Sequence, residues 1–79
     1  MRNIAEKIIA NIKYLGININ DTTSDFIIEN NIDSITFIEI ILNIEEEFSI
    51  LIPEDYLLME KMNTVDKIAT VINELFESN

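Results

Sequence analysis

The fold is decided by residues 33–48, which read DSITFIEIILNIEEEF. Asp33 is a favoured N-cap residue, so we expect a helix that begins at Ser34 and ends at Phe48. Advancing about 100° per residue gathers one apolar arc, which we assign to the core. This arc consists of Phe37, Ile40, Ile41, Ile44 and Phe48.

The same helix carries a second apolar stripe, nearly opposite to the core arc. A helix in so small a domain rarely buries two opposite faces. The stripe is therefore either covered by a short neighbouring helix or exposed as a docking surface rimmed by carboxylates, and helical geometry alone leaves both open. The stripe consists of Ile35, Ile38 and Leu42, with Glu39 and Glu46 on one side and Glu45 on the other.

The rest of the chain predicts three more helices, one of them short. Apolar residues at helical spacing indicate a helix at about 3–15, after which Gly16 is a typical terminator. Pro53 suits the first turn of a short helix at about 54–59, and Thr64 caps a last helix at about 64–77. Residues 17–33 are expected to form a long loop pinned to the core by Phe26, Ile27 and Ile28. We therefore predict an all-α, four-helix bundle that forms one domain over residues 1–79.

Composition excludes most enzymatic chemistry. The chain has 79 residues and a net charge of −10, yet 48% of it is hydrophobic, which favours a folded protein over a disordered one. It has no Cys and no His, so it lacks thiolates, the commonest general base and the usual zinc ligands. We expect no enzymatic activity. The negative charge also disfavours nucleic acids and favours partners that present Lys and Arg.

No metal site and no membrane association are expected. Residues 18–29 can be laid on the ligand positions of a calcium-binding loop, but Asn18 stands where Asp is required and Thr23 where Gly is required. No apolar run approaches the roughly 18 residues of a membrane span, and no secretory segment is present at the N-terminus. We expect a monomeric cytoplasmic protein.

Ser34 is the strongest candidate for a functional residue. A Ser at the start of a helix beside a capping Asp is common and can be purely structural. The alternative is a hydroxyl held exposed at a helix N-terminus, where the backbone N–H groups and the helix dipole favour an attached phosphate. Because the chain offers no suitable base, Ser34 is no catalytic nucleophile, but it can accept a group from another enzyme.

These residues resemble the acyl carrier protein family. Asp33-Ser34-Ile35 is similar to the Asp-Ser-Leu motif at which those proteins bear 4′-phosphopantetheine. The likeness covers essentially the whole chain. It continues at Phe26 upstream of the motif, and downstream at Phe37-Ile38-Glu39, Glu45-Glu46-Glu47-Phe48, Ile52-Pro53-Glu54 and Thr64-Val65.

The resemblance implies a role for each of the residues singled out above. Ser34 would bear the phosphopantetheine arm, taken from coenzyme A, and Asp33 would cap the helix and orient the loop toward the phosphopantetheinyl transferase. Acyl- or aminoacyl-loading and processing enzymes with basic docking patches would be the other partners. Their docking face would consist of Ile35, Ile38, Glu39, Leu42, Glu45 and Glu46.

The chain departs from the family pattern at three places, two of which bear on the pathway. Asn31 replaces the usual Gly before the motif but also tolerates positive φ, so the turn is expected to survive. Thr36 replaces an acidic residue common in fatty-acid carriers, and the connection from Pro53 to Thr64 is longer than theirs. Both features favour a free-standing carrier of a specialised pathway, polyketide, aminoacyl or similar. The alternatives are a fatty-acid carrier and a carrier-fold interaction module that is never modified.

Overall fold

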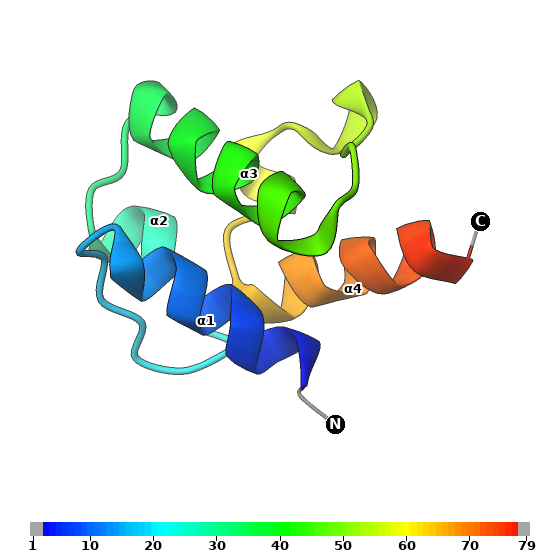
Figure 1. Ribbon diagram of the computed structural model, residues 1–79. Helices are drawn as coiled ribbons and strands as arrows, with labels where there is room; N and C mark the ends of the chain where they lie inside the picture. Colours follow the sequence, from blue (N-terminus) through cyan, green and yellow to red (C-terminus); the bar gives the residue numbers. More distant parts are fainter. Residues whose placement is uncertain (1–2, 78–79) are drawn as a thin grey trace.

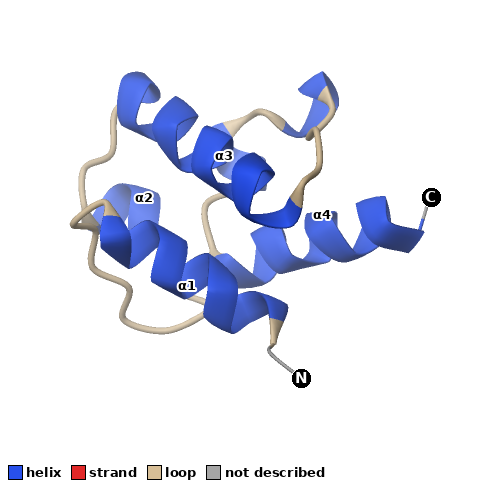
Figure 2. Cartoon of the chain, viewed as in Figure 1, coloured by secondary structure: helices blue, strands red, loops and turns tan. Residues whose placement is uncertain are grey.

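Four α-helices build the structure, a computed structural model that describes residues 3–77 (Figure 1). They are α1 (Ile4–Tyr14), α2 (Phe26–Glu29), α3 (Ser34–Phe48) and α4 (Val65–Glu77). Between residues 3 and 77 there is no β-strand, which confirms the predicted all-α class (Figure 2).

Local capping sets the ends of α1. The side chain of Asn3 accepts a hydrogen bond from the Ala5 N–H at 2.8 Å and so satisfies a backbone donor of the first turn. Ile8 and Ile12, one turn apart, are fully buried. The chain then leaves the helix through Gly16, whose φ of +84° is the conformation that glycine adopts without strain.

The core arc of α3 lies where its periodicity places it. Phe37, Ile40, Ile41 and Ile44 are buried, and Phe48 is partly buried against the same core. Helix α1 packs against both α3 and α4, so it is the central element of the bundle. None of the residues described as buried is polar or charged, so the core itself consists of apolar side chains.

Two connections differ from expectation. The predicted loop at 17–33 contains the short helix α2, which Asp25 caps through the Ile28 N–H at 3.0 Å. Four residues are too few to reveal a helical period, so the sequence pattern did not indicate this helix.

The prediction of a short helix at about 54–59 is wrong. In its place the chain forms two separate 3₁₀ turns, Glu54–Tyr56 and Met59–Lys61. Leu58 lies between them in an extended conformation and interrupts any helix, while Leu57 and Met59 pack against the core on either side of it. Packing of these side chains therefore overrides the helical start signal at Pro53.

No helix within residues 3–77 combines the length and the apolar character that crossing a membrane requires.

Candidate functional site

Ser34 is the first residue of α3 and is exposed to solvent. Within residues 3–77 its hydroxyl has no hydrogen-bond partner, so it is free to react. The preceding Asp33 is the N-cap, and its carboxylate accepts a hydrogen bond from the Thr36 N–H at 2.8 Å. That backbone hydrogen bond is the main reason why the pKa of Asp33 lies below its ordinary value. At the start of α3, a cap held by Asp33 thus lies next to the Ser34 hydroxyl, which makes no hydrogen bond within residues 3–77.

The turn before Ser34 is held by α2. Asn31 has a φ of +54°, which confirms that it adopts the left-handed conformation expected in place of Gly. Its N–H donates to the Ile28 carbonyl at 3.1 Å, and the N–H of Ile32 donates to the Ile27 carbonyl at 2.9 Å. The unpredicted helix α2 is therefore part of the support for Ser34.

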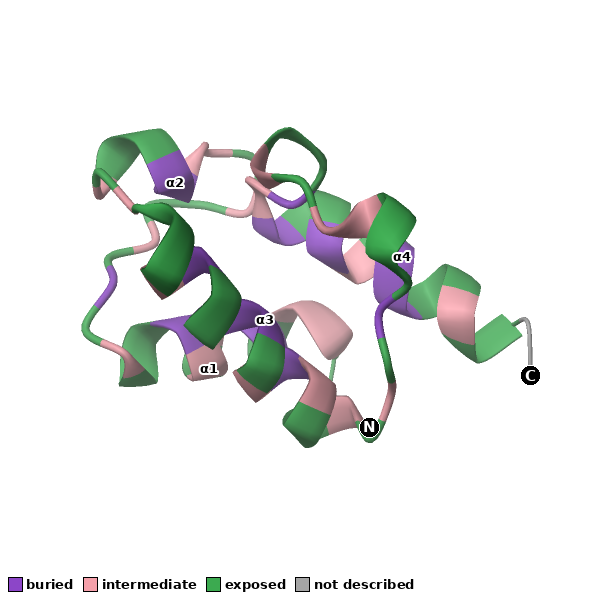
Figure 3. Cartoon of the chain, turned by 90° about the horizontal axis from the view of Figure 1, so that it is seen from above, coloured by how far each residue is buried: buried purple, intermediate pink, exposed green. Residues whose placement is uncertain are grey.

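The second apolar stripe of α3 is exposed. Ile35 is 76% exposed, Leu42 57% and Ile38 48%, so the segment that follows α3 leaves most of the stripe uncovered. In Figure 3, where the chain is coloured by burial, much of the near side of α3 has the green of exposed residues.

Three more exposed apolar residues lie on segments without a helical period: Ile28, Leu51 and Leu58. The expectation that Ile28 pins the loop to the core is wrong, because its side chain is 76% exposed, whereas Phe26 and Ile27 are buried as expected. In the single turn of α2 only one side can face the core, and Ile28 lies on the other.

The three carboxylates beside the stripe differ in their surroundings. Glu39 and Glu46 are exposed, as a charged rim requires. Glu45 is only partly exposed, and its carboxylate accepts a hydrogen bond from the Ile52 N–H at 2.8 Å. Glu45 therefore fixes the loop after α3, a contact that helical geometry alone does not reveal.

A phosphodiester fits the site by its chemistry. An anion bonded to the Ser34 oxygen would sit in solvent at the N-terminus of a helix of 15 residues, where the dipole and the N–H groups of the first turn stabilise negative charge. Asp33 already satisfies the Thr36 N–H and leaves the Ser34 oxygen available.

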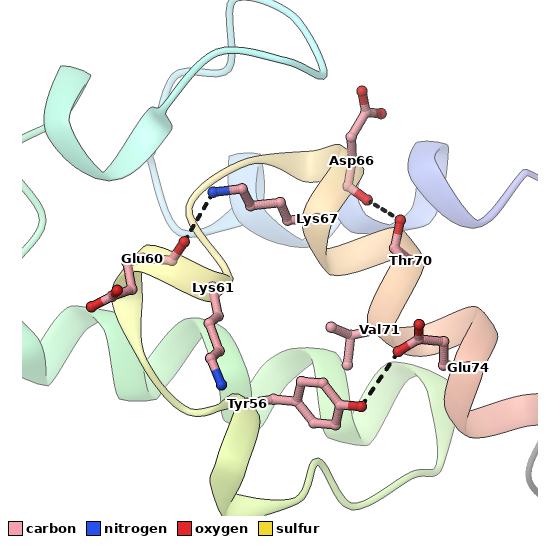
Figure 4. Close-up of a pocket in the computed structure, with 8 residues that line it drawn as sticks. All are labelled: Tyr56, Glu60, Lys61, Asp66, Lys67, Thr70, Val71 and Glu74. Atoms are coloured by element: carbon pink, nitrogen blue, oxygen red, sulfur yellow. Dashed lines mark hydrogen bonds between the residues drawn. The ribbon is translucent and has the colours of Figure 1, made fainter.

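A hollow in the described part of the chain lies elsewhere. It is an open groove of about 500 Å³ between the 3₁₀ turns and α4 (Figure 4). Lys61 Nζ donates to the Asp55 carbonyl and Lys67 Nζ to the Glu60 carbonyl, both at 2.9 Å, so the two lysines brace this segment. None of the predicted site residues lines the groove. Nor do residues 3–77 contain a cluster of three side chains suited to a metal ion.

Comparison with known proteins identifies one family. The model of the phosphopantetheine attachment site matches residues 9–72, which include α2, α3 and both 3₁₀ turns. No curated protein and no solved structure matches the chain.

Proposed function

Since the chain belongs to the phosphopantetheine attachment-site family, which includes the acyl carrier proteins, we propose that Ser34 bears the arm and presents a thioester-linked acyl or aminoacyl group to other enzymes. Members of this family bind 4′-phosphopantetheine covalently and are carriers rather than catalysts. They work with a phosphopantetheinyl transferase and with biosynthetic enzymes.

The observation that carries this proposal is the state of Ser34. Its hydroxyl is exposed, has no hydrogen-bond partner among the described residues and directly follows a capping carboxylate. In the loading step the Ser34 oxygen forms a bond to the phosphorus that bears pantetheine in coenzyme A. The bond from that phosphorus to the bridging pyrophosphate oxygen breaks, 3′,5′-ADP leaves, and the hydroxyl proton passes to a base of the transferase.

We assign partner docking to the exposed stripe beside Ser34. Ile35, Ile38 and Leu42 supply apolar area, and Glu39 and Glu46 supply the charges that attract a basic patch. Glu45 stands at the edge of this face, but its carboxylate is engaged with Ile52. Such contacts are suited to a carrier that must leave each partner quickly.

A specialised pathway is the finer part of the proposal. It is supported by Thr36 at a position that is acidic in many fatty-acid carriers, and by the long connection from Pro53 to Thr64, which forms two 3₁₀ turns. Transfer of acetate- or malonate-derived groups by fatty-acid enzymes alone would contradict this assignment and favour the fatty-acid carrier.

The test is the intact mass after incubation with coenzyme A and a broad-specificity phosphopantetheinyl transferase. Wild type and the matched control Ser24→Ala should each gain one phosphopantetheine, whereas Ser34→Ala should gain none. Because the Ser34 side chain is exposed and makes no hydrogen bond within residues 3–77, its replacement should leave the Tm nearly unchanged. If wild type gains nothing while a known carrier is modified in the same reaction, the unmodified interaction module is the better hypothesis.

A further inference from the structure

A side-chain bridge joins the approach to α4 with the start of α2. Asn63 Nδ2 donates to Asp25 Oδ2 at 2.7 Å, across 38 positions of sequence, in a partly buried setting. The same two segments are joined a second time, because the Phe26 N–H donates to the Asn63 carbonyl at 3.2 Å. A hydrogen bond with a charged partner is stronger than a neutral one, so this bridge is a firm contact between distant parts of the chain.

Asp25 has two tasks at once. While Oδ2 accepts from Asn63, Oδ1 accepts from the Ile28 N–H at 3.0 Å and caps α2. One carboxylate therefore both begins the helix and fixes where it lies on the bundle.

Backbone hydrogen bonds connect α2 to the turn that leads to Ser34. The Asn30 N–H donates to the Phe26 carbonyl at 3.1 Å, and the Ile32 N–H donates to the Ile27 carbonyl at 2.9 Å. Two residues after Ile32 comes Ser34. The turn that presents Ser34 is thus tied to α2, and α2 is tied to Asn63.

The amide of Asn63 also has an unfavourable effect on the stability of the fold. Its Oδ1 atom is buried and has no hydrogen-bond partner within residues 3–77. A buried oxygen without a donor is destabilising, so this side chain is not the one that would best fill the position for stability alone. Its favourable contribution is the bond from Nδ2 to Asp25.

We infer that Asp25 and Asn63 are positioning residues for the modification of Ser34: their bridge holds α2, and through it the turn at Asn31, in the arrangement that the transferase recognises. This inference rests on the proposed function of Ser34. Without the bridge, α2 and the turn would spend part of their time in other arrangements, and the apparent affinity of the transferase would fall with the competent fraction.

Two substitutions separate the bridge from the cap. Asn63→Ala removes the bridge but leaves Asp25 to cap α2, while Asp25→Ser keeps a capping oxygen and loses the bond to Asn63. The matched control is Asn11→Ala, which removes another long-range amide–carboxylate bond, from Asn11 Nδ2 to Glu47 Oε1 at 3.1 Å.

The first readout is the kinetics of loading with coenzyme A and the broad-specificity transferase, at a temperature where every variant is folded. Both bridge variants should raise KM for the carrier by about two- to tenfold with kcat nearly unchanged, and Asn11→Ala should not. The double variant Asn63→Ala with Asp25→Ser should have about the same KM as either single variant, because each substitution alone already removes the bridge. A lower kcat at constant KM, or an equal effect of Asn11→Ala, would overturn the inference.

The second readout does not depend on loading. Amide hydrogen exchange at Asn30 and Ile32 should accelerate by about tenfold in Asn63→Ala, while the amides of α1 keep their protection. Uniform acceleration over the whole chain would show a purely global role and would contradict positioning. If wild type is not loaded at all, the proposed function fails, and the exchange pattern still decides whether the bridge fixes the turn.

Discussion

The carboxylate of Glu45 accepts a hydrogen bond from the backbone N–H of Ile52 at 2.8 Å, so the last turns of α3 hold the loop that follows them. The carbonyl of Glu45 accepts a second one from the Ile50 N–H at 3.1 Å. Between them, Ser49 turns the chain with a left-handed φ of +54°. We call these two hydrogen bonds the Glu45 clasp. The clasp holds the loop where Ile52 is buried in the core, so Glu45 has a structural role.

Glu45→Ala should destabilise the fold by about 1 kcal/mol, because the partly buried N–H of Ile52 loses its acceptor. Its matched control is Glu46→Ala, one position further along the same helix, where the side chain is exposed. That variant should stay within about 0.5 kcal/mol of wild type. Urea unfolding followed by circular dichroism measures both, and equal effects would show that the clasp contributes nothing.

The two apolar faces of α3 should respond differently to truncation. Ile44→Ala removes a side chain that is fully buried, so it should cost about 2–5 kcal/mol. Ile38→Ala removes one that is half exposed and should change stability by less than about 1 kcal/mol. The same urea experiment compares them. A large loss with Ile38→Ala would show that the stripe is part of the core.

Much of the fold could be predicted because three helices are long enough to display a period. The spacing of Ile40, Ile41 and Ile44 predicts the buried side of α3, and the side chain of Thr64 accepts from the Lys67 N–H as a cap should. The prediction of the candidate site rests on the same local chemistry, since Asp33 caps the helix that Ser34 begins. These features depend on residues close together in sequence.

What could not be predicted depends on contacts between distant residues. The bond between Asp25 and Asn63, 38 positions apart, leaves no periodic mark in the sequence. The exposure of Ile38 depends on the path of residues 49–61, and that path depends on packing by Leu57 and Met59 rather than on helical propensity. Short elements such as α2 are therefore where the sequence-based prediction failed.

The cap at Asp33 should make stability depend on pH. Its pKa is lowered in the folded state, mainly by the Thr36 N–H, so the folded chain favours the charged carboxylate. This stabilisation is complete above the ordinary value of 3.8 and is lost as the pH falls through the lowered value of the folded state. The Tm advantage of wild type over Asp33→Ala should therefore be full near neutral pH and shrink in acid.

Asp33→Ser is the control for that titration. Its hydroxyl caps the helix without changing charge, so its advantage over Asp33→Ala should persist into acid. Thermal unfolding of the three variants between about pH 2 and 7 makes the comparison. If the advantage of wild type were the same at every pH, the charge of Asp33 would have no part in capping α3.

Glu39→Lys should slow association with the transferase by about two- to tenfold at low salt, because Glu39 is an exposed charge on the proposed docking face. Stopped-flow binding measures the rate, and added salt should reduce the difference between the variants by screening the charges. Glu77→Lys makes the same charge change at the end of α4, away from Ser34 (Figure 1), so it should have the smaller effect. Equal slowing by both would point to net charge rather than to a local contact, and an association rate that salt leaves unchanged would remove the acidic rim from the interface.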